Sequence, residues 1–429
     1  MTEDNSEFLE SPQQESRGSF GLLFLAVLID LLGFGIIIPI LPFLVEEVDK
    51  AQAGFLLAVL LSVYSLAQFV SAPLWGRLSD RIGRRPVILV GLFGSTIGFT
   101  MFGLVNTYNL YLASRIIAGL FTGATLPTAR AYIADITPPK DRAKRYGLLG
   151  AAFGIGFTFG PAIGSILSLD FFAISGLPEQ APAALFAAGL TLINLFLAFR
   201  NLPESLTPEV LERIAMQPEQ NQLEELRNFL KFAQIPLLLV MFLVTTLIFS
   251  GFETVLPLYA NFVDGRINQD NIGYFFAGIG LLVAIAQSTL VGPVVDRFGD
   301  DQTILISIVL QVIGFALLAL ANSLILLIIV IIPLGLGTAL LNPAINSAIS
   351  NRIPQEQQGG GLGINSSIGS LGRVIGPLYG GILYDQISPG SPFLIGAVVL
   401  LLIFFLGFSP LRSTVVAVSE NQFADPTAD

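Results

Sequence analysis

Long apolar segments alternate with short polar connections over nearly the whole chain. A helix needs about 20 mostly apolar residues to cross a bilayer, and twelve segments are long enough. The pattern therefore predicts an all-α membrane protein with twelve transmembrane helices. The expected spans cover residues 20–44, 53–75, 86–105, 109–135, 145–168, 182–200, 236–262, 271–295, 302–321, 323–350, 360–384 and 391–411.

Polar segments lie at the two ends and in the middle of the chain. Residues 1–18 are acidic rather than basic, so they do not form a cleaved signal peptide. We expect 1–18 and 412–429 to be disordered cytosolic tails. Between them, a bundle at 19–200 and a bundle at 236–411 flank a cytosolic linker at 201–235. The linker sequence LEELRNFLKF has apolar residues at helical spacing, which predicts an amphipathic helix.

The composition is that of a chain whose main solvent is lipid. Hydrophobic residues make up 53% of the chain and charged residues 12%, against about a quarter charged in a soluble domain. The chain contains no cysteine and no histidine, which excludes disulfides, thiolate or imidazole metal sites and Ser-His-Asp catalysis. Basic residues are few and form no stripe, so we expect no nucleic-acid partner. We also expect no enzyme activity, no metal and no cofactor.

The short loops differ in charge on the two sides of the membrane, and positive loops face the cytoplasm. We therefore expect a multi-pass protein of the inner or plasma membrane with both termini in the cytoplasm. The basic residues of the loops after spans two and four are Arg77, Arg81, Arg84, Arg85, Lys140, Arg142, Lys144 and Arg145, whereas the opposite loops carry only Lys50 and Arg266.

The chain repeats itself at an offset of 216 residues. GRLSDRIGRRPVI at 76–88 returns as GPVVDRFGDDQTI at 292–304, and Gly-Pro at 160–161 returns at 376–377. One ungapped offset for many glycines and prolines predicts two parallel, pseudo-symmetric six-helix bundles. In this plan the substrate site lies between the bundles, near the middle of the membrane.

Several motifs resemble those of one family. GRLSDRIGRRPV after span two resembles the signature loop of the major facilitator superfamily, and Arg115-Ile-Ile-Ala-Gly119 resembles its span-four motif. GIGFTFGPAIG at 154–164 is similar to the span-five motif of proton-coupled antiporters. VLIDLLGFGIIIPILP and AYIADITPPKDRAKRYGLLGAAFGIG resemble drug:proton antiporters, tetracycline-efflux proteins in particular. The resemblance covers about 20–411 and implies the major facilitator fold and proton-coupled export.

Several positions depart from the family pattern. Ala118 stands where the span-four motif often has glutamine. Gly98 stands near the place where tetracycline exporters carry an acidic residue in span three, and Arg130 and Arg373 are unexpected inside spans. The absent acid and the two arginines disfavour tetracycline itself as the substrate.

The resemblance implies that the repeated loop takes part in conformational gating. Asp80 is placed to accept hydrogen bonds from a helix N-terminus, for which we consider span eleven, while Gly76 and Gly83 permit a tight turn. The alternative is that Asp80 caps its own loop and that the arginines only set topology. The gating candidates are Gly76, Asp80, Arg81, Gly83, Arg84, Arg85, Gly160, Pro161, Gly164, Asp296, Arg297, Gly376 and Pro377.

The two copies of this loop differ in charge. Asp300 and Asp301 stand where the first copy has Arg84 and Arg85. Because the first half can set the orientation alone, we interpret the second copy as keeping the turn without the charge.

Five ionisable residues lie deep in the expected spans, where each costs at least about 2–3 kcal/mol. They are Asp30, Arg115, Arg130, Glu253 and Arg373. Asp30 is about ten residues into span one, roughly 15 Å along a helix. We expect Asp30 to carry the coupled proton, Arg115 to tune it, and Glu253 to be the second candidate. The alternative is structural ion pairing between helices.

Polar residues at helical spacing indicate a wet substrate cavity. Asn342, Asn346 and Ser350 recur every four residues along span ten. The alternative is that such side chains hold helices together. The cavity candidates are Tyr64, Gln68, Arg130, Gln287, Asn342, Asn346, Ser366, Ser370 and Arg373.

These features predict a secondary active transporter, specifically a proton-coupled antiporter that exports a small organic compound or drug by alternating access. One alternative is a facilitator or proton-linked importer of sugars or organic anions. Another is a transporter-like receptor or scaffold that moves nothing. The expected partners are a small-molecule substrate, protons and the lipid bilayer, and we expect a monomer.

Overall fold

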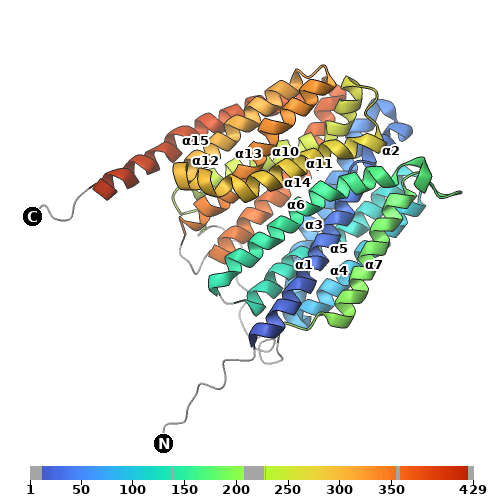
Figure 1. Ribbon diagram of the computed structural model, residues 1–429, viewed down its shortest axis with the longest axis horizontal. Helices are drawn as coiled ribbons and strands as arrows, with labels where there is room; N and C mark the ends of the chain where they lie inside the picture. Colours follow the sequence, from blue (N-terminus) through green and yellow to red (C-terminus); the bar gives the residue numbers. More distant parts are fainter. Residues whose placement is uncertain (1–11, 138, 207–226, 228, 354–357, 424–429) are drawn as a thin grey trace, which may run out of the picture. The chain divides into compact units, whose positions relative to one another are not determined.

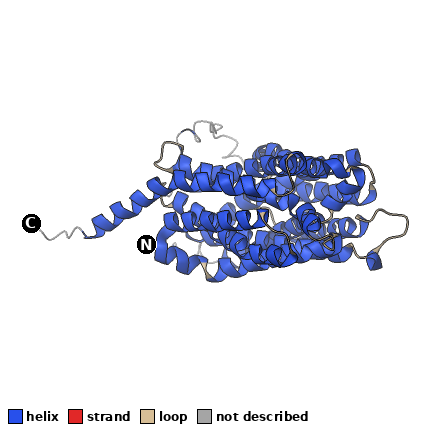
Figure 2. Ribbon diagram, turned by 90° about the horizontal axis from the view of Figure 1, so that it is seen from above, coloured by secondary structure: helices blue, strands red, loops and turns tan. Residues whose placement is uncertain are grey.

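The computed structural model describes residues 12–137, 139–206, 227, 229–353 and 358–423. Every regular element in these ranges is a helix (Figure 2), which confirms the all-α prediction. Most of the linker, including the start of its predicted amphipathic helix, lies outside the described residues. Helix extends from Pro12 at one end and to Phe423 at the other, into both segments expected to be disordered tails.

In the described ranges, twelve long helical segments correspond one to one with the predicted spans (Figure 1). The first predicted span is formed by two helices, because the chain turns at residues 38–40 and Pro42 then fits the first turn of the next helix. The helices of the first half are α1 (Pro12–Ile37), α2 (Leu41–Val48), α3 (Ala53–Ile82), α4 (Arg84–Leu104), α5 (Tyr108–Ile136), α6 (Pro139–Leu167) and α7 (Ala181–Asn201). Those of the second half are α10 (Ile235–Val263), α11 (Gln269–Thr289), α12 (Val291–Ala319), α13 (Leu324–Ser350), α14 (Gln358–Gln386) and α15 (Ser391–Phe423).

Helix packing divides the chain into two compact units. The first unit consists of Met1–Ile40 and Val63–Pro218, and the second of Leu41–Ser62 and Glu219–Asp429. In the first unit α1 packs mainly on α6 and α7, and α4 on α5 and α7. In the second unit α10 packs on α14, and α12 on α13 and α15. Helix α3 therefore begins in the second unit and continues in the first.

Ten helical stretches of the described chain are long and apolar enough to cross a membrane. The two remaining long helices are α6 and α14, which occupy equivalent places in the sequence repeat. Both are rich in glycine, which lowers their hydropathy and lets neighbouring helices approach closely.

Glycines related by the repeat lie at equivalent helix crossings. A Cβ added to Gly160 of α6 would lie 2.8 Å from the Cα of Gly35 in α1. The repeat carries these residues to Gly376 and Gly251, and a Cβ added to Gly251 would lie 2.8 Å from the Gly376 carbonyl oxygen. The α1–α6 and α10–α14 crossings thus use the same close backbone contact.

We expect Gly160→Ala to destabilise the first unit, because the added Cβ would force α1 away from α6. Overpacking of this kind costs about 1–3 kcal/mol and should lower the thermal unfolding temperature of the protein in detergent. Gly189→Ala in α7 is the matched control, since nothing lies within 4 Å of its added Cβ. Equal losses in the two variants would contradict the prediction.

Candidate functional site

The repeated loop is shorter than the sequence analysis predicted. Helix α3 continues to Ile82, and Gly83 alone separates it from α4. Gly83 has a φ of +102° and its repeat counterpart Gly299 a φ of +75°, a region that favours glycine. Gly76 lies inside α3, so the prediction that it forms part of the turn is wrong. Helix α3 continues through the polar residues that precede Gly83. Gly83 is therefore the one residue that has to turn the chain.

A buried arginine organises the first copy of the loop. The Arg84 side chain is 7% exposed, and it forms ion pairs with Asp80 and with Asp135 at the end of α5. Its Nη1 also donates to Ser79 Oγ at 2.7 Å. Asp80 is thus paired with an arginine of its own loop. The proposed role of this loop in conformational gating stays a prediction. Asp135 was missed by the sequence analysis because it lies 51 residues from Arg84.

Glu204 caps the start of α4. Its two carboxylate oxygens accept the backbone N–H groups of Arg84 at 2.8 Å and Arg85 at 3.0 Å. Helix N-termini carry unpaired N–H groups and a positive dipole end, so a carboxylate there is favourable. The chain just after α7 is thereby fixed to the repeated loop.

The second copy of the loop has exchanged partners rather than lost them. At the positions equivalent to Arg84 and Asp135, Asp300 Oδ2 accepts a hydrogen bond of 2.8 Å from Asn351 Nδ2. The neighbouring Asp301 forms an ion pair of 2.7 Å with Arg352. An acid therefore replaces Arg84 and an amide replaces Asp135, so these two positions still form a hydrogen bond in the second copy. Our interpretation that the second copy keeps only the turn is therefore incomplete.

The other charged residues of the second copy are solvent-facing within their unit. Asp296 and Arg297 are both exposed. The Arg297 guanidinium carbon lies 5.4 Å from the ring centroid of Phe298. In the first copy, Arg81 is likewise exposed.

Asp30 lies in the interior of the first unit, with 5% of its surface exposed. It lies within hydrogen-bonding reach of Ser95 on α4, and Ser95 Oγ is 3.3 Å from Thr122 Oγ1 on α5. Asp30 Oδ1 has no hydrogen-bond partner among the described residues. The structure therefore places a carboxyl group in a small buried polar cluster of α1, α4 and α5.

Arg115 is buried in an aromatic environment in the same unit, with 1% of its surface exposed. Its guanidinium carbon lies 4.4 Å from the Phe102 ring centroid and 6.0 Å from that of Phe99. Tyr64 is close enough to interact with it electrostatically. Within the described chain no ion pair joins Arg115 to Asp30.

Aromatic residues connect these two groups. Tyr64 stacks on Phe34 with 5.0 Å between ring centroids, and Phe34 lies one turn after Asp30 on α1. Phe99 lies one turn after Ser95 on α4. Asp30 and Arg115 therefore both lie in the interior of the first unit, and the expectation that Arg115 tunes Asp30 stays a prediction.

Glu253 and Arg373 come together in the second unit. Glu253 on α10 and Arg373 on α14 are close enough to interact electrostatically. Arg373 Nη2 donates to Ser370 Oγ at 3.1 Å, and Ser370 Oγ donates to the Ser366 carbonyl at 3.0 Å. Three of the cavity candidates thus share one face of α14, opposite an acid of α10.

Asn346, which is exposed on α13, joins a third helix to the polar residues of α14. Its Oδ1 accepts a hydrogen bond of 3.0 Å from Nδ2 of Asn365, which is 2% exposed. The sequence analysis missed Asn365, because it lies about 100° around α14 from Ser366 and so falls outside the stripe of polar residues at helical spacing. Among the remaining candidates, Gln68 and Arg130 are half-buried, whereas Gln287 and Asn342 are exposed on their unit.

Asp385 is a further residue that the sequence analysis missed. It lies at the end of α14, and its two oxygens accept the backbone N–H groups of Gly54 at 3.1 Å and Phe55 at 2.7 Å. These N–H groups begin α3. A Cβ added to Gly54 would lie 2.9 Å from the Gly381 carbonyl oxygen, so the two helices are in close contact. Within the second unit Asp385 therefore holds the first turn of a helix that continues into the first unit.

We expect Asp385→Asn to loosen the first turn of α3, because an amide oxygen lacks the charge that favours a helix N-terminus. A cap of this kind contributes about 1–2 kcal/mol, so the amides of Gly54 and Phe55 should exchange with solvent about tenfold faster. Asp49→Asn is the control, since Asp49 caps only the short helical turn before α3. Unchanged exchange in Asp385→Asn would disprove the capping role.

Comparisons with known proteins agree with this arrangement. The family model for the Major Facilitator Superfamily matches residues 23–266 and 266–424. Tetracycline resistance protein, class C, of Escherichia coli is 33% identical over 369 residues, covering 85% of this chain and 89% of that protein. Multidrug resistance protein 1 of Bacillus subtilis (strain 168) is 29% identical over 386 residues, covering 88% and 92%. The crystal structure of the human organic anion transporter MFSD10 (TETRAN) matches with a TM-score of 0.68 and 26% identity, covering 91% of this chain and 99% of that one.

Proposed function

This chain belongs to the Major Facilitator Superfamily, and from that premise we propose that it exports a small organic compound in exchange for protons. The chain is an integral, multi-pass membrane transporter and not an enzyme. Export of a drug-like compound is supported by relatives named for resistance to tetracycline and to multiple drugs.

Asp30 is the observation that carries the proposed exchange with protons. A carboxylate with a buried oxygen that lacks a partner is costly to keep charged, so binding a proton relieves that cost. In the exchange that we propose, Asp30 takes up a proton from the outer side and releases it to the cytoplasm. The substrate leaves in the opposite direction as the two units alternate in access.

Vesicle transport tests this function directly. Inside-out vesicles containing the purified chain should accumulate an exported drug when their lumen is made acidic, and should not accumulate it without the gradient. A thermal-stability panel of drugs, sugars and organic acids first identifies the compound to use. Transport that ignores the pH gradient would rule out proton exchange but would leave transport itself intact.

A facilitator or proton-linked importer of organic anions is the second candidate function. It is supported by the buried Arg115, by the half-buried Arg373 of the second unit, and by the likeness to a named organic anion transporter. Stabilisation by organic acids but not by neutral or cationic drugs would favour this candidate. Uptake that runs only down the anion gradient would then separate a facilitator from a coupled importer.

We propose in addition that both termini and the linker face the cytoplasm, in the inner or plasma membrane. The support is the excess of basic residues in the loops after spans two and four. In this cysteine-free chain, Gln220→Cys should be labelled by an impermeant reagent only after the cytoplasmic side is opened. Labelling from outside intact cells would reverse the topology.

We further propose that one chain is the transporting species. In the two-bundle plan the substrate path lies between the halves of a single chain, so no second copy is needed. Light scattering of the purified protein should therefore give the mass of a monomer in its detergent micelle.

A further inference from the structure

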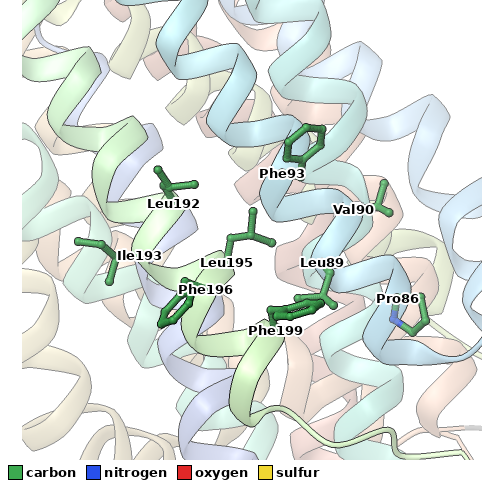
Figure 3. Close-up of a pocket in the computed structure, with 9 residues that line it drawn as sticks. All are labelled: Pro86, Leu89, Val90, Phe93, Leu192, Ile193, Leu195, Phe196 and Phe199. Carbon is green, nitrogen blue, oxygen red and sulfur yellow. The ribbon is translucent and has the colours of Figure 1, made fainter.

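An apolar groove runs along the first unit between α4 and α7 (Figure 3). Its volume is about 810 Å³, and all of its lining side chains are hydrocarbon or aromatic. The aromatic residues at its edges are among the most exposed of the unit, for example Phe196 at 60% and Phe199 at 63%. The groove is lined by Pro86, Leu89, Val90, Phe93, Leu192, Ile193, Leu195, Phe196 and Phe199. We call it the α4–α7 groove.

Two arginines lie at one end of the α4–α7 groove. Arg85 is at the start of α4 and Arg200 is at the end of α7. Arg85 Nη2 donates to the Phe199 carbonyl at 2.6 Å, and its guanidinium carbon lies 5.7 Å from the Phe199 ring centroid. Arg85 Nε has no partner among the described residues. Arg200 follows Phe196 by one turn, so it continues the groove-lining face of α7.

The carboxylate of Glu204, just after α7, binds backbone N–H groups rather than a guanidinium. Glu204 accepts the backbone N–H groups of Arg84, Arg85 and Ser205. Arg84 is paired with Asp80 and Asp135. Among the described residues no ion pair joins Arg85 or Arg200 to an acid, so two guanidinium groups without an acidic partner lie at the end of a hydrocarbon-lined groove.

We propose that the α4–α7 groove binds an anionic phospholipid of the bilayer, with an acyl chain along the groove and the phosphate on Arg85 and Arg200. An apolar groove on a membrane-spanning unit suits a hydrocarbon chain. Guanidinium groups form strong charge-assisted hydrogen bonds with phosphate oxygens. Basic residues close to a membrane surface also attract anionic lipids.

The second half of the chain carries no arginine at the position equivalent to Arg85. The residue equivalent to Arg85 in the second half is Asp301, and it is paired with Arg352. The same corner of the second unit therefore presents a neutralised acid. The combination of an apolar groove and an arginine is a property of the first unit and is not dictated by the fold.

Lipid titration of the purified, full-length protein tests the proposal. Phosphatidylglycerol should bind more tightly than phosphatidylcholine with identical acyl chains, as measured by native mass spectrometry and by thermal stabilisation. Arg85→Gln and Arg200→Gln should each weaken phosphatidylglycerol binding about fivefold and leave phosphatidylcholine binding unchanged. Arg266→Gln is the matched control, because the Arg266 side chain is 93% exposed and belongs to the second unit.

The groove itself needs a separate variant. Val90→Trp should fill it and weaken the binding of both lipids. Arg200→Gln is informative even if Arg85→Gln fails to fold, because Arg200 is exposed, so its replacement should disturb the fold little. Equal binding of the two lipids, or an unchanged preference in Arg200→Gln, would overturn the proposal. Displacement of the lipid by a transported drug would make the groove a substrate site instead.

Discussion

Asp30→Asn is expected to abolish drug accumulation driven by a pH gradient in inside-out vesicles. Asparagine has the size of a protonated aspartate but cannot release a proton, so the chain would lose the step that couples proton flow to transport. Because the variant mimics the neutral form, it should still fold and bind substrate. The interior around Asp30 already contains the neutral polar groups Ser95 and Thr122, which suit an amide.

The measurement is the initial rate of uptake at a fixed gradient, compared with the rate without the gradient. Glu253→Gln is the matched control, since it neutralises the other interior acid and should leave coupling largely intact. If Asp30→Asn accumulates drug at the wild-type rate, Asp30 is not the coupling residue. Coupling would then be assigned to Glu253 if its variant is the one that fails.

Arg115 provides a related but weaker test of the same interior. The structure surrounds its guanidinium with Phe99 and Phe102, so lysine would lose the stacked, planar contact. Arg115 forms no ion pair with Asp30 among the described residues, so we expect Arg115→Lys to change proton coupling less than Asp30→Asn does. We therefore count Arg115 as a positioning residue.

Arg84→Asp is expected to have the second large effect, this time on stability and gating. The substitution places a third acid beside Asp80 and Asp135. Breaking a buried ion pair costs about 3–5 kcal/mol, and the partial exposure of Asp80 (42%) reduces this to about 2–3 kcal/mol. The thermal unfolding temperature in detergent and the rate of transport into vesicles should both fall.

The second half of the chain indicates which additional substitution should restore the stability lost in Arg84→Asp. Asp300 and Asn351 form a hydrogen bond at the positions equivalent to Arg84 and Asp135. The double variant Arg84→Asp, Asp135→Asn should therefore recover more than half of the lost stability, because the introduced amide can donate to the introduced carboxylate. Asp135→Asn alone is the control and should be mild, since Arg84 keeps Asp80. A double variant no more stable than Arg84→Asp would show that the two loops are not interchangeable.

Local sequence patterns predicted the helices well because membrane spans depend on length and hydropathy, which are local properties. Errors in the boundaries occurred where a polar segment remained helical, as at the end of α3, where the chain leaves the apolar pattern before the helix stops. The sequence also found Asp30, Glu253 and Arg373, because an ionisable residue in an apolar run is conspicuous. It could not find Asp385 or Glu204, which lie among ordinary polar residues at helix ends.

The sequence by itself determined the twelve helices, the internal repeat with its offset of 216 residues, and the chemistry excluded by the absence of cysteine and histidine. Tertiary structure alone decided which charges meet. Arg84 and Asp135 are 51 residues apart, and Gly54 and Asp385 are 331 apart, so no local pattern could pair them. It also decided that Arg115 faces aromatic rings rather than Asp30, because helix rotation and packing set the direction of a side chain. Hydropathy specifies that a segment is a helix, whereas the contacts of its faces depend on every helix packed around it.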